Sequence, residues 1–297
     1  MPKKPPANPR PVVVDTLNQE LMRFRFEYLA AGVKSGHGMD SQPHRHPVYE
    51  LFYFVSAGGQ HDVDFVQMPI ASGMLHWVKP GQVHFLNRDA HCEGFVVQFD
   101  LSFFPDEHDQ KWFEGLWLHR LAYSGHQDLS MDDLAQQEVM AFMQTWKQYA
   151  SGLATAELDR LRLRMLLAHA ERCYYSQWKP EQPAISGEKT LCKDFRQLVE
   201  QHFYSQHRLE FYTTQLHCSQ QTLARETKSL LGKAPLLVLH ERLLLEAKSM
   251  LMFTRLSNKE IAFTLGFEDP AYFGRFFKKH TGHSPEQMRK HLKEKYQ

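Results

Sequence analysis

Cysteine is scarce in this sequence, and the cysteines it has are far apart. The 297 residues include four of them, Cys92, Cys173, Cys192 and Cys218, and no two form a Cys-x-x-Cys pair. Their spacing therefore indicates neither a disulfide framework nor a zinc ribbon. We interpret them as reduced packing residues.

Long apolar runs are also missing. The longest, such as residues 51–55 and 235–239, are far shorter than the roughly 20 residues of a membrane-spanning helix. The N-terminus lacks the apolar region of a secretory signal. We therefore expect a cytoplasmic protein with no membrane partner. A hydrophobic content of 42% over this length is enough for two domains with buried cores.

The chain as a whole has almost no excess of either charge, since its net charge is +1. The balance is uneven, however: residues 191–297 hold 17 Lys and Arg against 11 Asp and Glu, whereas the remaining 190 residues hold 18 against 23. A basic end on an acidic body is typical of a nucleic-acid-binding module attached to another domain. A merely solvated surface would have the same composition, so charge alone leaves both interpretations open.

The patterning divides the chain into segments. Residues 1–14, with five prolines, predict a disordered arm. In residues 15–110, short β-branched and aromatic runs alternate with turn signals, which predicts an antiparallel sandwich or barrel. Residues 111–178 have a helical period, residues 179–190 are the best candidate for a linker, and residues 191–297 predict helices throughout. The predicted fold class is therefore multi-domain α+β.

Within the helical segment, the stretch 157–178 carries an apolar stripe. The residues on or near it are Leu158, Leu161, Met165, Ala168 and Cys173, and most of the arginines lie off it.

Two stretches near the C-terminus repeat one another at an offset of 50 residues. The pattern R-x2-K-x3-G-x2-P occurs at residues 225–235 and again at 275–285, and the expected helix caps Ser219 and Asp269 share the offset. Each copy predicts a short helix, a tight turn and a second helix that ends at a glycine, which are the parts of a helix-turn-helix. The segment between the copies, 235–253, predicts a helix that joins the two units.

The second helix of each unit has an inward and an outward face. Inward, at i, i+4 and i+7, we expect Leu223, Thr227 and Leu230 in one unit and Phe273, Phe277 and His280 in the other. The outward rows are small or polar near the helix start and basic further on. Small residues let a backbone approach a groove floor, Gln and Arg match base edges, and Lys neutralises phosphates.

The predicted DNA-binding residues are Ser219, Gln220, Gln221, Ala224, Arg225 and Lys228, followed by Pro270, Ala271, Gly274, Arg275 and Lys278. A solvated amphipathic helix would explain one such row equally well. Two rows in register favour DNA binding.

The stretch 241–289 closely resembles the second half of the AraC/XylS-type transcription regulators, whose DNA-binding domain is two helix-turn-helix units joined by a helix. The resemblance implies a regulator that binds double-stranded DNA sequence-specifically and responds to a small-molecule effector in an N-terminal cupin-like barrel, here residues 15–110. It further implies a homodimer joined through residues 111–178 and no enzymatic activity or cofactor. An activator would also contact RNA polymerase, but nothing in the sequence identifies the surface for that contact, so activation and repression both stay open. The effector-binding residues stay unassigned.

By the same resemblance, the base-reading positions fall on Gln221 and Arg225 in the first unit and on Pro270, Ala271 and Arg275 in the second. Neither Pro270 nor Ala271 has a side-chain hydrogen-bond donor. We therefore expect the second unit to read fewer bases and to depend on Arg275 and phosphate contacts.

Histidines cluster in the N-terminal half. The pattern His44-x-His46-x3-Glu50, followed by His84, resembles the two cupin motifs, in which three histidines and a glutamate bind a divalent metal. Imidazoles with a carboxylate suit zinc, nickel, iron or manganese. The proline-to-glycine spacing is one residue short of the motif, and Asn87 comes one residue early.

Two interpretations of this cluster stay open. Hydrogen-bonded histidines at strand ends would give the same pattern, so the sequence commits to no metal. If a metal is bound, the competing function is a metal-dependent cupin oxygenase or isomerase with an attached DNA-binding domain.

Overall fold

The structure is a computed structural model, and the residues it describes are 24–33, 42–116, 127–149, 156–178 and 189–296. They form two compact units, one within 24–178 and one within 189–296. The predicted arm and residues 179–188 of the predicted linker lie outside the described residues. None of the described helices is long and apolar enough to span a membrane.

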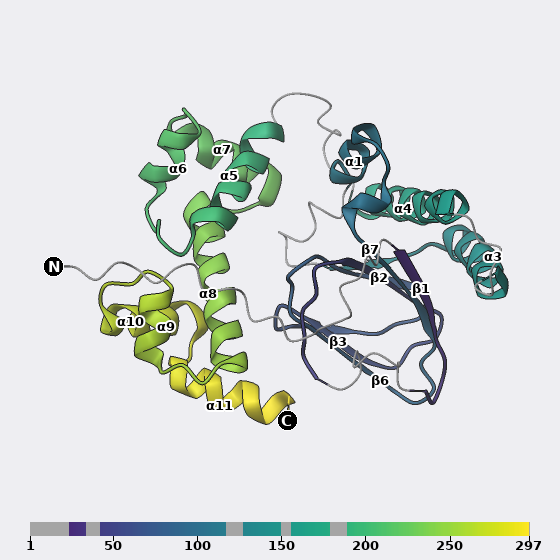
Figure 1. Ribbon diagram of the computed structural model, residues 1–297, viewed down its shortest axis with the longest axis horizontal. Coiled ribbons are helices and arrows are strands. Elements are labelled where there is room, and N and C mark those ends of the chain that lie inside the picture. Colours follow the sequence, from purple (N-terminus) through teal and green to yellow (C-terminus); the bar gives the residue numbers. More distant parts are fainter. Residues whose placement is uncertain (1–23, 34–41, 117–126, 150–155, 179–188, 297) are drawn as a thin grey trace. The chain divides into compact units, whose positions relative to one another are not determined.

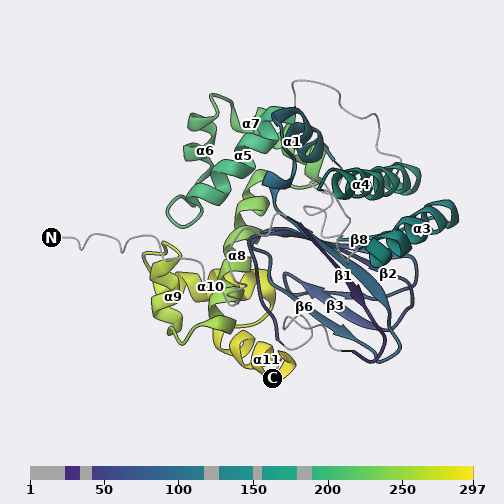
Figure 2. The same ribbon diagram turned by 45° about the vertical axis from the view of Figure 1, so that its right-hand side comes forward.

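The first unit is built on two antiparallel sheets (Figures 1 and 2). The larger sheet has the order β1 (Phe24–Leu29), β7 (Gly94–Phe99), β2 (Tyr49–Phe54), β5 (Met74–Val78) and β8 (Asp128–Ser130). The smaller sheet has the order β4 (Val66–Pro69), β3 (Gly59–Val63) and β6 (His84–Arg88). The predicted cupin-like antiparallel fold is confirmed.

Both faces of the larger sheet are buried, and alternation along each strand decides which side chains each face carries. On β2, Leu51 and Tyr53 belong to a core shared with helices, whereas Phe52 and Phe54 belong to the core between the two sheets. Because successive side chains of a strand point to opposite faces, Glu50 points with Phe52 and Phe54 into the barrel interior. Burial on both faces explains why this strand reads as an almost continuous apolar run.

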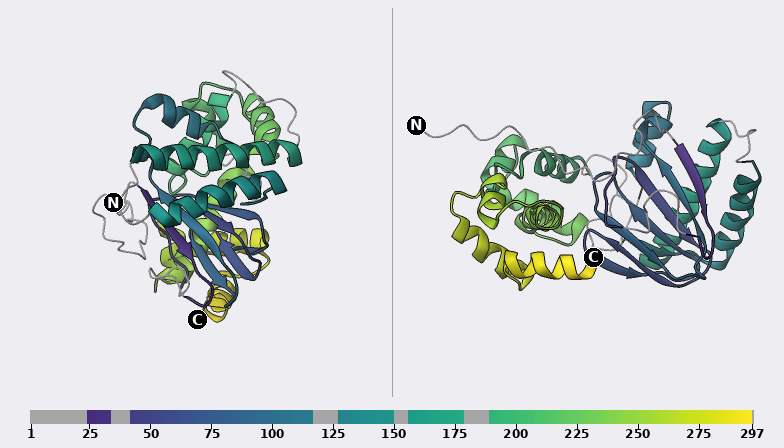
Figure 3. Two further views of the ribbon diagram at one scale, coloured as in Figure 1. Left: turned by 90° about the vertical axis from the view of Figure 1, so that its right-hand side faces the viewer. Right: turned by 60° about the horizontal axis from the view of Figure 1, so that its bottom comes forward.

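Helices cover the outer face of the larger sheet, where the teal helices lie against the blue strands in the right-hand view of Figure 3. They are the 3-10 helix η1 (Leu101–Phe103), α1 (Glu107–Glu114), α3 (Asp133–Tyr149) and α4 (Ala156–Trp178). The prediction that residues 111–178 are purely helical was wrong at one point. Strand β8 lies within them, because it buries Leu129 and extends the sheet by pairing with β5.

Helix α4 carries apolar residues on two faces. Leu163 and Leu166 are fully buried in the core that the helices share with the sheet. The stripe noted in the sequence is divided: Cys173 is buried in this same core, whereas Leu158, Leu161 and Met165 lie on another face and are 40%, 51% and 50% exposed. A helix that is apolar on more than one side is typical of one that packs against two partners.

Every regular element of the second unit is a helix within the described residues 189–296. The helices are α5 (Lys189–His202), α6 (Leu209–Gln215), α7 (Gln220–Leu231), α8 (Pro235–Phe253), α9 (Asn258–Thr264), α10 (Pro270–Thr281) and α11 (Pro285–Tyr296). The pairs α6–α7 and α9–α10 are the two predicted helix-turn-helix units, and α8 runs between them (Figure 1). Helices α7 and α10 end at Gly232 and Gly282, whose positive φ angles of 67° and 79° terminate a helix.

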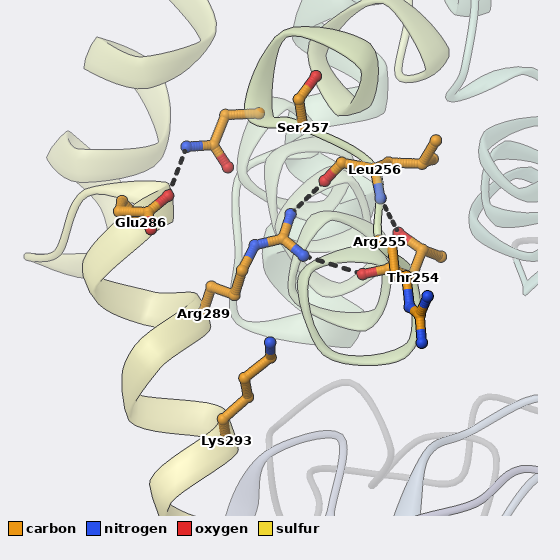
Figure 4. Close-up of a pocket in the computed structure, with 8 residues that line it drawn as sticks. Thr254, Arg255, Leu256, Ser257, Glu286, Arg289 and Lys293 are labelled. Atoms are coloured by element: carbon orange, nitrogen blue, oxygen red, sulfur yellow. Dashed lines mark hydrogen bonds between the residues drawn. The ribbon is translucent and has the colours of Figure 1, made fainter.

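An arginine ties the last helix to the end of α8 (Figure 4). The Arg289 guanidinium donates to the backbone oxygens of Leu251 at 3.2 Å, Thr254 at 2.9 Å and Leu256. Carbonyl groups at a helix C-terminus lack hydrogen-bond donors within the helix. Arg289 supplies donors to these carbonyl groups. The pocket drawn in Figure 4 belongs to this structural junction.

Candidate functional site

The predicted DNA-binding residues lie along the open side of α7 and α10. Three small ones (Ala224, Pro270 and Gly274) are half-buried, and the other eight are exposed. On the opposite side, Leu223 and Phe273 are at most 1% exposed and anchor each helix in its unit. The structure therefore presents these rows to solvent on two fixed helices.

Two of the inward expectations were wrong. His280 is exposed and Leu230 is only half-buried. Both lie in the last turn of their helix, where less of the surrounding unit remains to cover a side chain. His280 packs its ring beside that of His240 on α8, with ring centroids 4.9 Å apart.

The first turns of α7 and α10 differ in charge although both are capped as predicted. The Ser219 hydroxyl accepts from the Thr222 backbone N–H at 3.0 Å, and the Asp269 carboxylate accepts from those of Ala271 and Tyr272 at 2.8 and 3.1 Å. A helix N-terminus attracts phosphate. A neutral cap preserves that attraction in α7, whereas a carboxylate opposes it in α10.

The two predicted base-reading arginines are weakly held. Arg225 is 74% exposed with its Nε 3.2 Å from Glu226, and Arg275 is 69% exposed with its guanidinium 3.5 Å from Asp269. Exposed ion pairs contribute only about 0–1 kcal/mol. A base or phosphate group can therefore displace either carboxylate at little cost.

Tyr272 was missed by the sequence analysis. It is 56% exposed on α10, next to the predicted base-reading residue Ala271. An exposed aromatic ring here can contact a thymine methyl group or a sugar. The available signal was the helical period, which places Tyr272 at the border of the outward face, between Arg275 and the buried Phe276.

The turns inside the two units are built differently. His217 takes a positive φ of 49° in the first turn, and Gly266 takes one of 80° in the second. A Cβ atom on Gly266 would lie 2.0 Å from the backbone oxygen of Tyr204. The neighbouring His207 Nε2–H donates to the Leu265 carbonyl at 2.8 Å. The loop before α6 therefore packs directly against the turn of the second unit.

In the first unit the structure brings His44, His46, Glu50 and His84 together inside the barrel. None of the four is more than 6% exposed. His46 Nε2 lies 3.0 Å from Glu50 Oε2 and 3.0 Å from His84 Nε2, and His84 Nε2 lies 3.4 Å from Glu50 Oε2. One nitrogen of each histidine lies within 4.8 Å of the others.

The backbone holds this cluster in place. His44 and His84 pair across an isolated antiparallel bridge, with backbone nitrogen-to-oxygen distances of 3.0 and 2.9 Å. Gln98 on β7 donates to Glu50 Oε1 at 2.5 Å. Burial alone would raise the pKa of Glu50, but His46, the Gln98 hydrogen bond and His44 outweigh it and hold that pKa below its ordinary value. Glu50 is therefore a buried carboxylate.

Two further histidines, missed by the sequence analysis, continue the cluster. His61 Nε2 lies 3.2 Å from His84 Nδ1, and His61 Nδ1 lies 3.3 Å from His76 Nδ1. Burial lowers the pKa of His76 to about 3 and those of His61 and His84 well below their ordinary value. The only sequence signal was that His61 and His76 sit within strand-like runs.

Comparisons with known proteins match both halves of the chain. A family model described as an AraC-like ligand binding domain matches residues 28–167, and one described as a helix-turn-helix domain matches residues 212–291. A curated relative, the uncharacterized HTH-type transcriptional regulator YisR of Bacillus subtilis (strain 168), is 30% identical over 143 residues, which are 48% of this chain and 50% of that protein. The chain thus spans about half the length of this relative.

Two solved structures are among those similar to the chain. ToxT from Vibrio cholerae is 14% identical, with 90% of this chain and 98% of that one covered and a TM-score of 0.44. The C-terminal domain of AraT, a response regulator from Geobacillus stearothermophilus, is 31% identical, with 35% of this chain and 88% of that one covered and a TM-score of 0.33.

Proposed function

The chain belongs to the AraC family of transcription regulators, and on that premise we propose that it is a sequence-specific DNA-binding transcription factor whose barrel binds a small-molecule effector. The observation that carries the proposal is the pair of exposed rows on α7 and α10, repeated at an offset of 50 residues. We assign the effector domain to residues 15–110, the dimerisation region to 111–178, the linker to 179–190 and the DNA-binding domain to 191–297.

The helix between the units supports binding to two neighbouring grooves. Helix α8 has 19 residues, which at 1.5 Å per residue span about 28 Å. Together with the width of the units, this length suits the ~34 Å repeat of the major groove along one face of DNA. Both α7 and α10 can then contact one duplex.

The two helices contribute unequally to this proposal. Helix α7 offers the forked side chains of Gln221 and Arg225 and a neutral cap. Helix α10 offers Pro270, which has no N–H, and the acidic cap Asp269. We propose that α7 reads more bases, and that α10 depends on Arg275 and on phosphate contacts made by Lys278.

The exposed stripe on α4 supports a homodimer. Leu158, Leu161 and Met165 lie at i, i+3 and i+7, so they form one continuous apolar edge of α4. The same edge of a second copy is a self-complementary partner for it. We propose that an effector shifts the equilibrium between dimer arrangements that differ in DNA affinity. An activating contact with RNA polymerase and the absence of enzymatic activity stay predictions.

Selection of genomic fragments by the full chain, followed by binding titrations over a range of salt, tests the proposal. Arg225→Ala should cost about 1–3 kcal/mol and relax preference at particular base pairs. Lys278→Ala should weaken binding to all sequences alike and reduce the salt slope by about one.

Lys111→Ala is the matched control, because Lys111 is a 70% exposed lysine of the first unit. It should leave both the affinity and the salt slope unchanged. A full chain that binds promoter fragments no better than bulk competitor DNA at moderate salt would overturn the proposed function. Uniform weakening by Arg225→Ala would overturn its base-reading role.

A further inference from the structure

We propose that the barrel interior binds one divalent first-row transition-metal ion, with His44, His46, Glu50 and His84 as its ligands. This inference goes beyond the regulatory function and stands whether or not the chain controls transcription.

The spacing of the ligand atoms fits one ion. Two nitrogens and one oxygen, from His46, His84 and Glu50, lie 3.0, 3.0 and 3.4 Å from one another. Atoms about 2.1 Å from a shared ion lie about 3.0–3.4 Å apart in octahedral or tetrahedral coordination. A single point can therefore lie at ligand distance from all three atoms.

Hydrogen bonds fix the orientation of two of the imidazoles. His44 Nδ1 lies 3.0 Å from the Gln42 carbonyl oxygen, and His46 Nδ1 lies 2.9 Å from that of Val48. Since a carbonyl oxygen only accepts, both Nδ1 atoms carry the proton and donate it. When neutral, each ring then carries its lone pair on Nε2, the atom of His46 that lies 3.0 Å from both Glu50 Oε2 and His84 Nε2. Metal-binding histidines are oriented by backbone carbonyls in the same way.

The converging atoms need a positive charge between them. Glu50 is 0% exposed, and its Oε2 accepts no hydrogen bond of suitable geometry although His46 Nε2 is 3.0 Å away. With the proton of His46 on Nδ1, both Nε2 and the carboxylate oxygen present lone pairs at this separation. A proton would satisfy one pair of these atoms, whereas a metal ion satisfies all of them at once. A buried carboxylate also needs such compensation.

His61 is not a ligand in this proposal but holds the ring of the ligand His84 in place. With a metal on His84 Nε2, the His84 Nδ1–H donates to His61 Nε2, and the His61 Nδ1–H donates in turn to His76, over distances of 3.2 and 3.3 Å. Neutral imidazoles can sustain this order of donors. One metal site thereby explains why the buried histidines His84, His61 and His76 lie within hydrogen-bond distance of one another.

The donor set selects the class of metal. Three imidazoles and one carboxylate suit zinc, nickel, iron, copper or manganese, whereas calcium and magnesium prefer oxygen ligands. The His44 nitrogen lies up to 4.8 Å from the other histidine ligand atoms. The largest separation around an ion at about 2.1 Å is about 4.2 Å. A small shift of His44 together with the Gln42 carbonyl that orients its ring would therefore bring His44 to ligand distance.

Metal analysis of the full chain tests the inference. The chain is purified without a histidine tag or chelators, and bound metal is measured by plasma mass spectrometry. Chelator-stripped protein is then titrated with Zn²⁺, Ni²⁺, Mn²⁺ and Mg²⁺ while the melting temperature is followed. We expect about one equivalent of transition metal per chain and a raised melting temperature with at least one transition ion but not with Mg²⁺.

Two histidine variants make the test specific. His84→Gln should weaken metal binding by at least about tenfold, whereas His76→Gln, at an equally buried position that is not a ligand, should keep one equivalent. Should His84→Gln fail to fold, Glu50→Gln removes a ligand charge at unchanged volume and should also lose the metal. Co²⁺ added to the stripped protein should give visible absorption bands that both ligand variants lack.

The inference is overturned by protein that binds only traces of metal and whose melting temperature responds to none of the three transition ions. It is equally overturned if His76→Gln loses the metal as completely as His84→Gln does. Neither of these results would count against the proposal of specific DNA binding, because DNA binding is measured in a separate experiment.

Discussion

Replacing Gly266 by alanine tests how the turn of the second helix-turn-helix unit is built. Gly266 has a φ of 80°, in the left-handed region, and an added Cβ would lie 2.0 Å from the backbone oxygen of Tyr204. An L-residue with a side chain pays about 1–2 kcal/mol for that backbone conformation. The Tyr204 loop must also retreat, because a backbone oxygen cannot accept a carbon at that distance.

Displacement of the Tyr204 loop should also weaken a second interaction. His207 follows Tyr204 in this loop and donates to the Leu265 carbonyl at 2.8 Å. A hydrogen bond of this kind contributes about 0.5–1.5 kcal/mol. Together the two effects predict that Gly266→Ala lowers the free energy of unfolding of the second unit by about 1.5–3.5 kcal/mol.

Hydrogen exchange of the full chain provides the assay, since it resolves α9 and α10 from the rest. All five tryptophans precede residue 179, so tryptophan fluorescence reports on the first unit only and should not change. The matched control is His217→Gly in the first turn, where a side chain already occupies a φ of 49°. Glycine relieves the cost of about 1–2 kcal/mol of the left-handed conformation but makes the unfolded chain more flexible, at about 0.4–1 kcal/mol, so the variant should be neutral or stabilising by up to about 1 kcal/mol. Unchanged protection of α9 and α10 in Gly266→Ala would refute the reasoning.

Three further predictions concern the other parts of the molecule. Leu161→Glu should convert a dimer into monomers in analytical ultracentrifugation, because it places a charge in the α4 stripe, whereas Leu134→Glu, at a 58% exposed position on α3, should not. His61→Asn should weaken metal binding about 10–100-fold while CD spectra stay unchanged, and equal affinities in a competition titration would contradict the positioning role. The pKa of His240 is lowered to about 4 by burial, with His280, His207 and Lys279 nearby. Between pH 6.5 and 4 the unfolded chain therefore binds a proton there that the folded chain does not, so the second unit should lose stability as the pH falls through this range. His240→Phe should remove that part of the pH dependence in unfolding titrations, and an unaltered pH profile would contradict it.

The exposed rows on α7 and α10 could be predicted from the sequence because each depends on short-range geometry. Residues at helical spacing share a face wherever the helix lies, so the exposure of Arg225 and Arg275 follows from the period of a single helix. Caps such as Ser219 and Asp269 are equally local. The failures at Leu230 and His280 occurred at helix ends, where burial depends on how far the neighbouring elements extend.

The sequence by itself determined the repeated helix-turn-helix units, their caps and their exposed rows, since each is encoded within about 20 consecutive residues. Only the tertiary structure decided which apolar face of α4 packs on the barrel and which is left exposed, because both faces have the same chemistry. It alone also placed His61 and His76 in line with His84. Pairing between strands far apart in the chain sets which side chains meet inside a barrel, and the local patterns of one sequence do not show which distant strands pair or in which register.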